Sequence, residues 1–99
     1  MKLLKRNKME LDDLREKIDE ADEELLNIIS ERLSLMPKIA TIKQSQNISI
    51  NQEIREKEVI EKIRKKAVQR DLNPDFIEKI IIEIILESKK IQQKNMEKI

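Results

Sequence analysis

A long amphipathic stretch without glycine at the start of this 99-residue chain is the feature that most constrains its fold. Apolar residues recur there every three or four positions, which is the pattern of a helix that packs along one face. This apolar seam consists of Leu11, Leu14, Ile18, Ala21, Leu25, Ile28, Leu35, Ile39 and Ile42. We expect one helix from about Met9 to Gln44, ~54 Å long at ~1.5 Å per residue. Such a helix is too long for a compact chain of this size, which indicates that it projects against a partner.

Pro37 lies inside this stretch. Proline has no backbone N–H, and its ring clashes with the preceding turn of a helix. We therefore expect a kink at Pro37 in a continuous helix. The alternative is that Pro37 splits the stretch into two helices.

Two shorter helices follow. The polar segment 45–51 is the first break, with Asn51 as a plausible N-cap for a helix over about Gln52 to Arg70. The second break, "DLNPD", combines an N-cap, a proline at the first helical position and an acidic residue near the positive end of the helix dipole. These are Asn73, Pro74 and Asp75, and the helix they begin is expected to end near Asn95.

The fold class predicted from these patterns is all-α, with one long and two shorter helices per chain. Residues 9–95 are expected to form a single helical domain. Residues 1–8 are expected to be a flexible extension and residues 96–99 a frayed end.

Composition excludes several kinds of function. The chain has no Gly, Cys or His, so it lacks a glycine-rich phosphate loop, a thiolate nucleophile, a usual structural zinc site and the commonest general base. Its net charge is +1 and Phe76 is its one aromatic residue, so we expect no nucleic-acid partner. It has neither a signal peptide nor a run of about 18 apolar residues, so we expect no membrane association and a cytoplasmic location.

Two cations lie where the seam should be apolar. Arg32 occupies a seam position, and Lys43 lies ~16 Å further along a straight helix on nearly the same face. Together they could bracket a small anion. The simpler interpretation is that Arg32 pairs with a carboxylate on a neighbouring helix and Lys43 is a solvated helix end.

The last helix carries a second anomaly. Ser88 and Gln92 continue the face of Ile81 and Ile85, and both can hydrogen-bond a ligand without changing charge near neutral pH. The alternative is that the apolar stripe simply ends and both residues face water.

Three further charged residues are candidates. Arg55 and Glu56 lie near the start of the second helix and either are solvated or point into a site. Arg15 flanks the seam, ~42 Å from Lys43 along a straight helix. If Arg15 and Lys43 bind the same small molecule, Arg15 must come from a second subunit.

Taken together, four segments resemble the all-helical class of chorismate mutases over about residues 11–93. They are "LREKIDEADEELLNIISER", "KIATIK", "IREKEVIEKI" and "ILESKKIQQ". The resemblance implies an intertwined homodimer with shared active sites. It also implies a Claisen rearrangement of chorismate to prephenate, on the way to phenylalanine and tyrosine, without cofactor or metal. Because the chain ends soon after the third helix, we expect a monofunctional enzyme.

The resemblance also implies a role for each candidate residue. Arg32, and Arg15 from the other subunit, would bind substrate carboxylates, with Arg55 helping to fix the charged site. Lys43 would contact a carboxylate and the ether oxygen, and Gln92 would donate to that oxygen. Glu56 would hold the ring hydroxyl, and Ser88 would assist at the ring carboxylate.

Two residues depart from the family pattern. Gln52 stands where relatives usually carry an acidic residue, so it can still hydrogen-bond a hydroxyl but lacks the charge. Pro37 is atypical in the first helix and could shift Lys43 relative to Arg32.

The chemistry fits this composition, because a pericyclic rearrangement needs no nucleophile, general base or metal. It needs the substrate held in a reactive conformation and donors aimed at the oxygen that gains charge. One alternative is an isochorismate–pyruvate lyase on the same fold. Another is a non-catalytic helical dimerisation module in which Arg32 sets the register.

Overall fold

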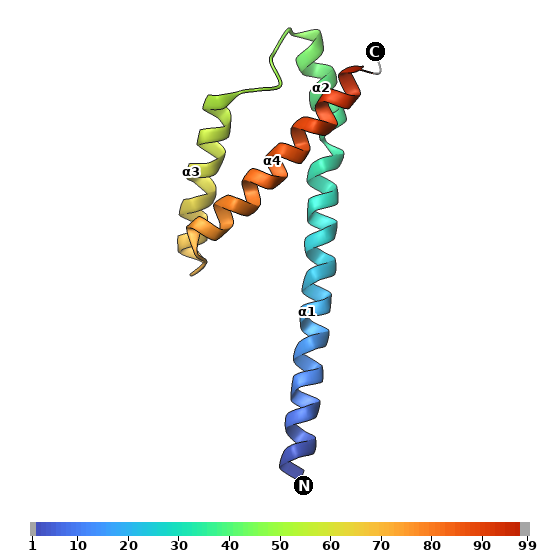
Figure 1. Ribbon diagram of the computed structural model, residues 1–99, viewed down its shortest axis with the longest axis vertical. Coiled ribbons are helices and arrows are strands. Elements are labelled where there is room, and N and C mark those ends of the chain that lie inside the picture. Colours follow the sequence, from blue (N-terminus) through green and yellow to red (C-terminus); the bar gives the residue numbers. More distant parts are fainter. Residues whose placement is uncertain (1, 98–99) are drawn as a thin grey trace. The chain divides into compact units, whose positions relative to one another are not determined.

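The computed structural model describes the backbone of residues 2–97 and the side chains of residues 10–97. Four helical segments follow one another along the chain, namely α1 (Lys2–Ser34), α2 (Met36–Ser45), α3 (Glu53–Gln69) and α4 (Pro74–Glu97) (Figure 1). Residues 2–97 contain helices, turns and short irregular segments but no strand, which confirms the all-α fold class. Over the same residues, no helix has both the length and the apolar character needed to cross a bilayer.

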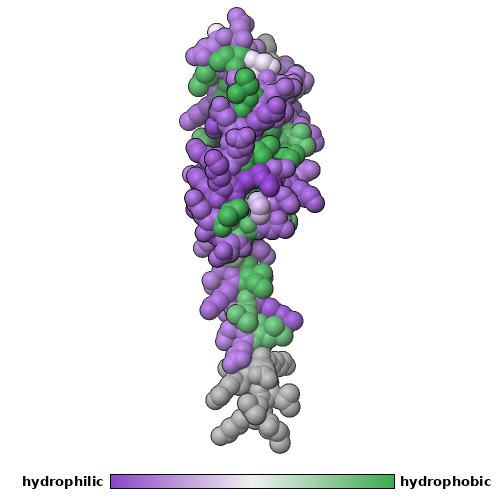
Figure 2. Space-filling model, turned by 90° about the vertical axis from the view of Figure 1, so that its left-hand side faces the viewer, coloured by the Kyte–Doolittle hydropathy of each residue, from purple (hydrophilic) through white to green (hydrophobic). Residues whose placement is uncertain are grey.

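The chain divides into two compact units, residues 1–32 and 33–99. The first unit is most of α1, which begins at Lys2 rather than at the predicted Met9. Its part of the apolar seam is exposed, with Leu14 56%, Ile18 58% and Ile28 62% accessible. Figure 2 shows this as green hydrophobic surface beside purple hydrophilic surface along α1. The periodicity correctly predicted an amphipathic helix, and large apolar side chains on its face are exposed among the described residues 10–32.

The predicted first helix is interrupted at Leu35, so the split that Pro37 allows is what the structure has. Pro37 is the second residue of α2, where the backbone N–H that proline lacks has no intrahelical acceptor. Two side chains bind the backbone here, because the Pro37 carbonyl accepts from Thr41 Oγ1 at 3.0 Å and from Asn95 Nδ2 at 3.2 Å. The separations calculated above between Lys43 and the arginines assumed one straight helix, and they no longer apply.

α2 ends in a turn that folds back over its last residues. Asn47 has a φ of 55°, in the left-handed region that glycine usually occupies after a helix. The N–H of Ile48 donates to the Lys43 carbonyl at 2.8 Å, and the N–H of Asn47 donates to the Gln44 carbonyl at 3.4 Å. These two bonds form a Schellman motif. In a chain without glycine, asparagine suits the left-handed position because its short polar side chain can hydrogen-bond locally.

α3 ends in the same way. Asp71 has a φ of 55°, the N–H of Leu72 donates to the Ala67 carbonyl at 2.9 Å, and the N–H of Asp71 donates to the Val68 carbonyl at 3.1 Å. At the other end of α3, Gln52 is the N-cap rather than the predicted Asn51, and its side chain makes no capping hydrogen bond. That prediction was wrong because the helix begins one residue later than an Asn51 cap requires.

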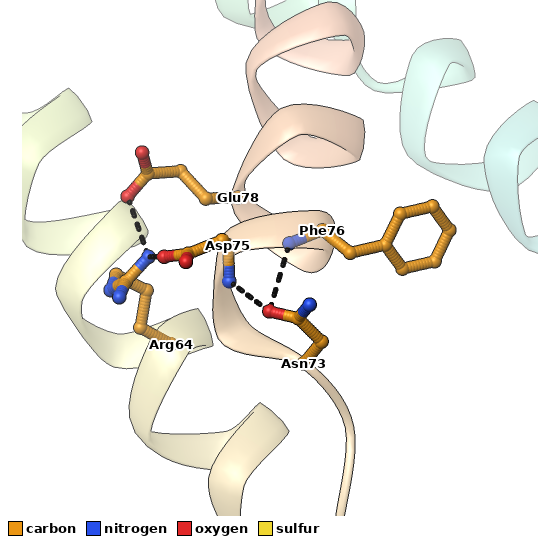
Figure 3. Close-up of polar contacts among 5 residues, drawn as sticks. All are labelled: Arg64, Asn73, Asp75, Phe76 and Glu78. Atoms are coloured by element: carbon orange, nitrogen blue, oxygen red, sulfur yellow. Dashed lines mark hydrogen bonds and ion pairs between the residues drawn. The ribbon is translucent and has the colours of Figure 1, made fainter.

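The start of α4 was predicted correctly. The Asn73 side chain accepts from the N–H of Asp75 at 2.9 Å and from that of Phe76 at 3.5 Å, which is N-capping (Figure 3). Arg64 of α3 reaches this end and donates to Asp75 at 3.0 Å and to Glu78 at 3.3 Å. The two carboxylates raise the pKa of Arg64, chiefly through its hydrogen bond to Asp75. The network joins α3 to the first turn of α4.

In the second unit, α4 packs against both α2 and α3. Few of the described side chains are fully buried there. The buried apolar residues are Met36, Ala40, Ala67 and Ile85, and the buried polar ones are Ser88 and Gln92. The unit therefore has a small apolar core, and polar side chains share its interior.

Asn47→Ala should lower the free energy of unfolding by about 1 kcal/mol, because alanine lacks the short polar side chain whose local interactions let asparagine adopt the left-handed conformation. Asn47→Gly should retain stability within about 0.5 kcal/mol, because glycine adopts that conformation freely. The matched control is Gln46→Ala, one residue earlier at a φ of −103°, which should be nearly neutral. Urea unfolding followed by circular dichroism measures all three. Equal losses for Asn47→Ala and Gln46→Ala would contradict the assignment.

Candidate active site

Lys43, at the last turn of α2, lies at the centre of the candidate site. Its Nζ donates to Gln92 Oε1 of α4 at 3.0 Å and to the Ile50 carbonyl at 3.3 Å. The Schellman turn after α2 returns the chain toward Lys43, so that residue 50 can supply this carbonyl. The ammonium group is partly buried, and both of its described acceptors are uncharged.

Gln92 is only 5% exposed and is held at both ends of its amide. Oε1 accepts from Lys43, and Nε2 donates to the thioether sulfur of Met36 at 3.4 Å. Because Lys43 can only donate, it requires Oε1 rather than Nε2 to face it. The donor end of the amide is therefore turned to sulfur, which is a weak acceptor.

A second polar pair lies beside this one. Lys89 Nζ of α4 is 2.8 Å from Glu56 Oε1 of α3, and the two side chains are only 25% and 26% exposed. The pKa of Lys43 is lowered, mainly because burial disfavours its charged form. The Glu56 carboxylate opposes this shift and the Lys89 ammonium adds to it, so the three groups share one electrostatic environment.

Ser88 is also buried, at 4% exposure. Its hydroxyl donates to the Ile84 carbonyl one turn earlier at 2.7 Å. Both Ser88 and Gln92 are thus inside the second unit, and the alternative that they face water was wrong. The amphipathic face of α4 continues past its apolar half with polar side chains that pack inward.

The remaining candidates of α3 lie at its exposed start. Gln52 and Arg55 are exposed and line a shallow hollow with Glu53, Ile54 and Glu58. Among the described side chains, neither Gln52 nor Arg55 forms a hydrogen bond or ion pair with Lys43 or Gln92. The carbonyl of Gln52 does accept the backbone N–H of Glu56 at 3.0 Å, so it helps to begin the turn that carries Glu56.

The two arginines of α1 belong to the first unit. Arg15 is exposed and lies 3.8 Å from Asp12 on the same helix, a weak solvated pair. Arg32 is partly buried. The structure thus brings together four of the eight predicted site residues in the second unit, namely Lys43, Glu56, Ser88 and Gln92.

Sequence reasoning missed two residues of this site, Met36 and Lys89. Lys89 precedes Gln92 by one helical turn, so helical spacing could have indicated a shared face. It stands in a lysine pair after Ser88, a pattern more typical of solvated charge. Met36 carries no signal of its own, because its contact with Gln92 depends on how α2 crosses α4.

The arrangement is suited to an anion that also carries a hydroxyl group. Lys43 and Gln92 are donors, whereas Glu56 is an acceptor. No group of three or more His, Cys, Asp or Glu side chains suited to a metal ion occurs among the described residues. The described polar groups can bind, orient and stabilise charge.

The sequence profile of chorismate mutase type II matches residues 14–93, which include every element of this site. This chain belongs to the type II chorismate mutase family. A chorismate mutase of Methanocaldococcus jannaschii is 36% identical over 87 residues, covering 88% of each chain.

Two further relatives are longer proteins, and the match covers only part of each of them. A bifunctional chorismate mutase/prephenate dehydratase of Aquifex aeolicus is 44% identical over 54 residues, which are 54% of this chain and 15% of that one. The T-protein of Enterobacter agglomerans is 32% identical over 79 residues, which are 80% of this chain and 21% of that one.

Replacing Glu56 with glutamine should lower the pKa of Lys43 further. The Glu56 carboxylate is the group that raises this pKa, so removing its charge destabilises the ammonium form. Side-chain NMR titration of Lys43 measures the change. The control is Glu58→Gln, at an exposed position on the same helix, which should leave the pKa of Lys43 unchanged. An unchanged or raised pKa in Glu56→Gln would contradict the shared environment.

Proposed function

We propose that this chain rearranges chorismate to prephenate at a site centred on Lys43 and Gln92. The observation that carries the proposal is the hydrogen bond of 3.0 Å between these side chains, partly buried where α2 meets α4. It places one cationic donor and one amide together inside a chorismate mutase domain. The cytoplasmic location expected from the sequence stays a prediction.

The reaction is an intramolecular exchange of bonds. The ether C–O bond breaks as a new C–C bond forms, and no atom enters or leaves the substrate. Negative charge develops on the ether oxygen in the transition state, so donors placed at that oxygen lower the barrier. Lys43 and Gln92 supply those donors, and a site that holds the substrate folded supplies the required conformation.

Gln92 must turn its amide to donate to the same oxygen as Lys43, because Oε1 faces Lys43 in this structure. Its Nε2 points away from Lys43 and donates to the Met36 sulfur at 3.4 Å, a weak contact that costs little to give up. Exchanging this weak acceptor for an oxygen that gains negative charge strengthens the bond during the reaction. The interaction therefore favours the transition state over the bound substrate, which is the condition for a higher kcat.

The other residues bind the groups that do not react. Glu56, as a carboxylate, accepts a hydrogen bond from the ring hydroxyl, and Ser88 assists at the ring carboxylate. Arg32 binds a carboxylate through its planar guanidinium, which is suited to bidentate contact. Arg55 and Gln52, at the exposed start of α3, complete the polar rim of the site.

We further propose that the active protein is an intertwined homodimer, in which each site takes Arg15 from the second copy. The exposed apolar seam of α1 supports this, because Leu14, Ile18 and Ile28 each leave more than half of their surface in water. Packing this seam against a second copy would remove that apolar surface from water.

Lys43→Ala and Gln92→Ala should each lower kcat/KM for chorismate by about 10²–10³, the usual effect of losing a donor to a developing negative charge. Purified protein is mixed with chorismate without added metal, and the appearance of prephenate is followed. Isochorismate is offered in parallel, since salicylate and pyruvate would identify the lyase instead.

Lys38→Ala and Gln93→Ala are the matched controls, because both residues are exposed on the same two helices. They should retain the activity of the unchanged protein. A folded protein that produces no prephenate would overturn the proposed reaction. Full activity in Lys43→Ala or Gln92→Ala would overturn the proposed site.

Mixing two inactive variants tests the shared site. Arg15→Ala and Lys43→Ala should each be nearly inactive alone. After subunit exchange, half of the dimers are mixed, and each mixed dimer has one intact site, so about a quarter of the activity should return. Mixing Arg32→Ala with Lys43→Ala is the control, because both residues come from one chain and no intact site forms. Equal recovery in both mixtures, or none in the first, would contradict a site shared through Arg15.

A further inference from the structure

Lys89 lies in the site without a role in the reaction described above. Its ammonium is 2.8 Å from Glu56 Oε1, and both side chains are about three-quarters buried. It comes from α4, one helical turn before Gln92, and so approaches Glu56 of α3 from the element that also carries the donor amide. An ion pair at this depth is screened by solvent far less than a surface pair.

The Glu56 carboxylate interacts with two ammonium groups. It acts electrostatically on Lys43 of α2, although the hydrogen bonds of Lys43 go to Gln92 and the Ile50 carbonyl. Its close ion pair goes to Lys89 instead. Two cations therefore compete for one carboxylate, and the structure shows Lys89 holding it.

Because Glu56 pairs with Lys89, the hydrogen-bond partners of Lys43 are neutral groups. A neutral amide and a carbonyl bind an ammonium less strongly than a carboxylate does. Lys43 can therefore exchange them for substrate oxygens at a small cost. If Lys43 were paired directly with Glu56, the substrate would first have to separate a buried ion pair.

We propose that Lys89 is a positioning residue, which holds the Glu56 carboxylate away from Lys43 so that Lys43 remains available to the substrate. The inference rests on the proposed function for its effect on turnover. The structural part of the inference is that Glu56 pairs with Lys89 rather than with Lys43, and it depends only on the observed ion pair. Lys89 also pairs with Oε1 of Glu56, which leaves Oε2 to accept a hydrogen bond from the substrate hydroxyl.

Lys89→Met removes the ammonium and keeps a long apolar stem. The variant should lose roughly tenfold to a hundredfold in kcat/KM, the range that corresponds to one hydrogen bond with a charged group. Most of the loss should fall on KM, because a Lys43–Glu56 pair must be broken before substrate binds. Lys89→Arg should restore most of the activity, since it returns a cation to Glu56. Lys90→Met is the matched control, because Lys90 is the next residue on α4 and is exposed.

A double-mutant cycle separates positioning from direct substrate contact. In a Glu56→Gln background, adding Lys89→Met should change kcat/KM by no more than about twofold, because its target is already gone. If Lys89 instead contacts the substrate directly, its removal should cost as much in the Glu56→Gln background as in the unchanged protein. That result would overturn the positioning role.

The titration of Lys43 tests the same proposal without turnover. Glu56 from α3 and Lys89 from α4 are the charged groups that act on Lys43. In Lys89→Met an opposing positive charge is lost and Glu56 becomes free to pair with Lys43. The pKa of Lys43 should therefore rise, and the alkaline loss of kcat/KM should move to higher pH.

The two proposals fail in distinguishable ways. If the unchanged protein does not convert chorismate, the proposed function fails, while the NMR titration of Lys43 still decides the partner of Glu56. If the enzyme is active but the pKa of Lys43 stays or falls in folded Lys89→Met, the positioning role is overturned. Circular dichroism of each variant establishes that the helices are intact.

Discussion

The Lys43 ammonium connects α2 to α4 and to the turn that follows α2. A partly buried cation needs acceptors, and each of its acceptors comes from a different part of the chain. Gln92 comes from α4, and the Ile50 carbonyl comes from the turn after α2. That turn requires the left-handed backbone conformation of Asn47. The same contacts therefore join α2 to α4 and hold the two donors of the proposed site.

The hydrogen bonds of Lys43 and Gln92 are weak enough to be exchanged for stronger acceptors. Gln92 Nε2 donates to sulfur and Lys43 Nζ donates to neutral oxygens, so both donors are paired before substrate arrives. Each of these partners is a weaker acceptor than a carboxylate or a developing oxyanion. A chain without His or Cys can build such a site because the family reaction requires placed charge rather than proton transfer or a nucleophile.

Sequence reasoning succeeded where local chemistry decides the structure. Asn73, Pro74 and Asp75 specify the start of α4 through bonds within one turn, and they were predicted correctly. Pro37 allowed both a kink and a split, because the outcome depends on contacts with residues far along the chain, such as Asn95, which donates to the Pro37 carbonyl. Lys43, Glu56, Ser88 and Gln92 were singled out by their positions along the expected helices, and the family resemblance then implied a role for each. Met36 and Lys89 were missed, because their partners are set by how separate helices cross.

The exposure of the apolar seam of α1 is not explained by the structure of one chain. Its periodicity is that of a buried helix face, yet its residues are exposed in the isolated chain. The second unit buries few apolar side chains of its own, so a single copy gains little from the hydrophobic effect. In the proposed dimer, one association would cover the seam and deliver Arg15 to the neighbouring site. Stability and catalysis would then depend on the same helix, because the residues that bury its apolar face flank the arginine that completes the charged site.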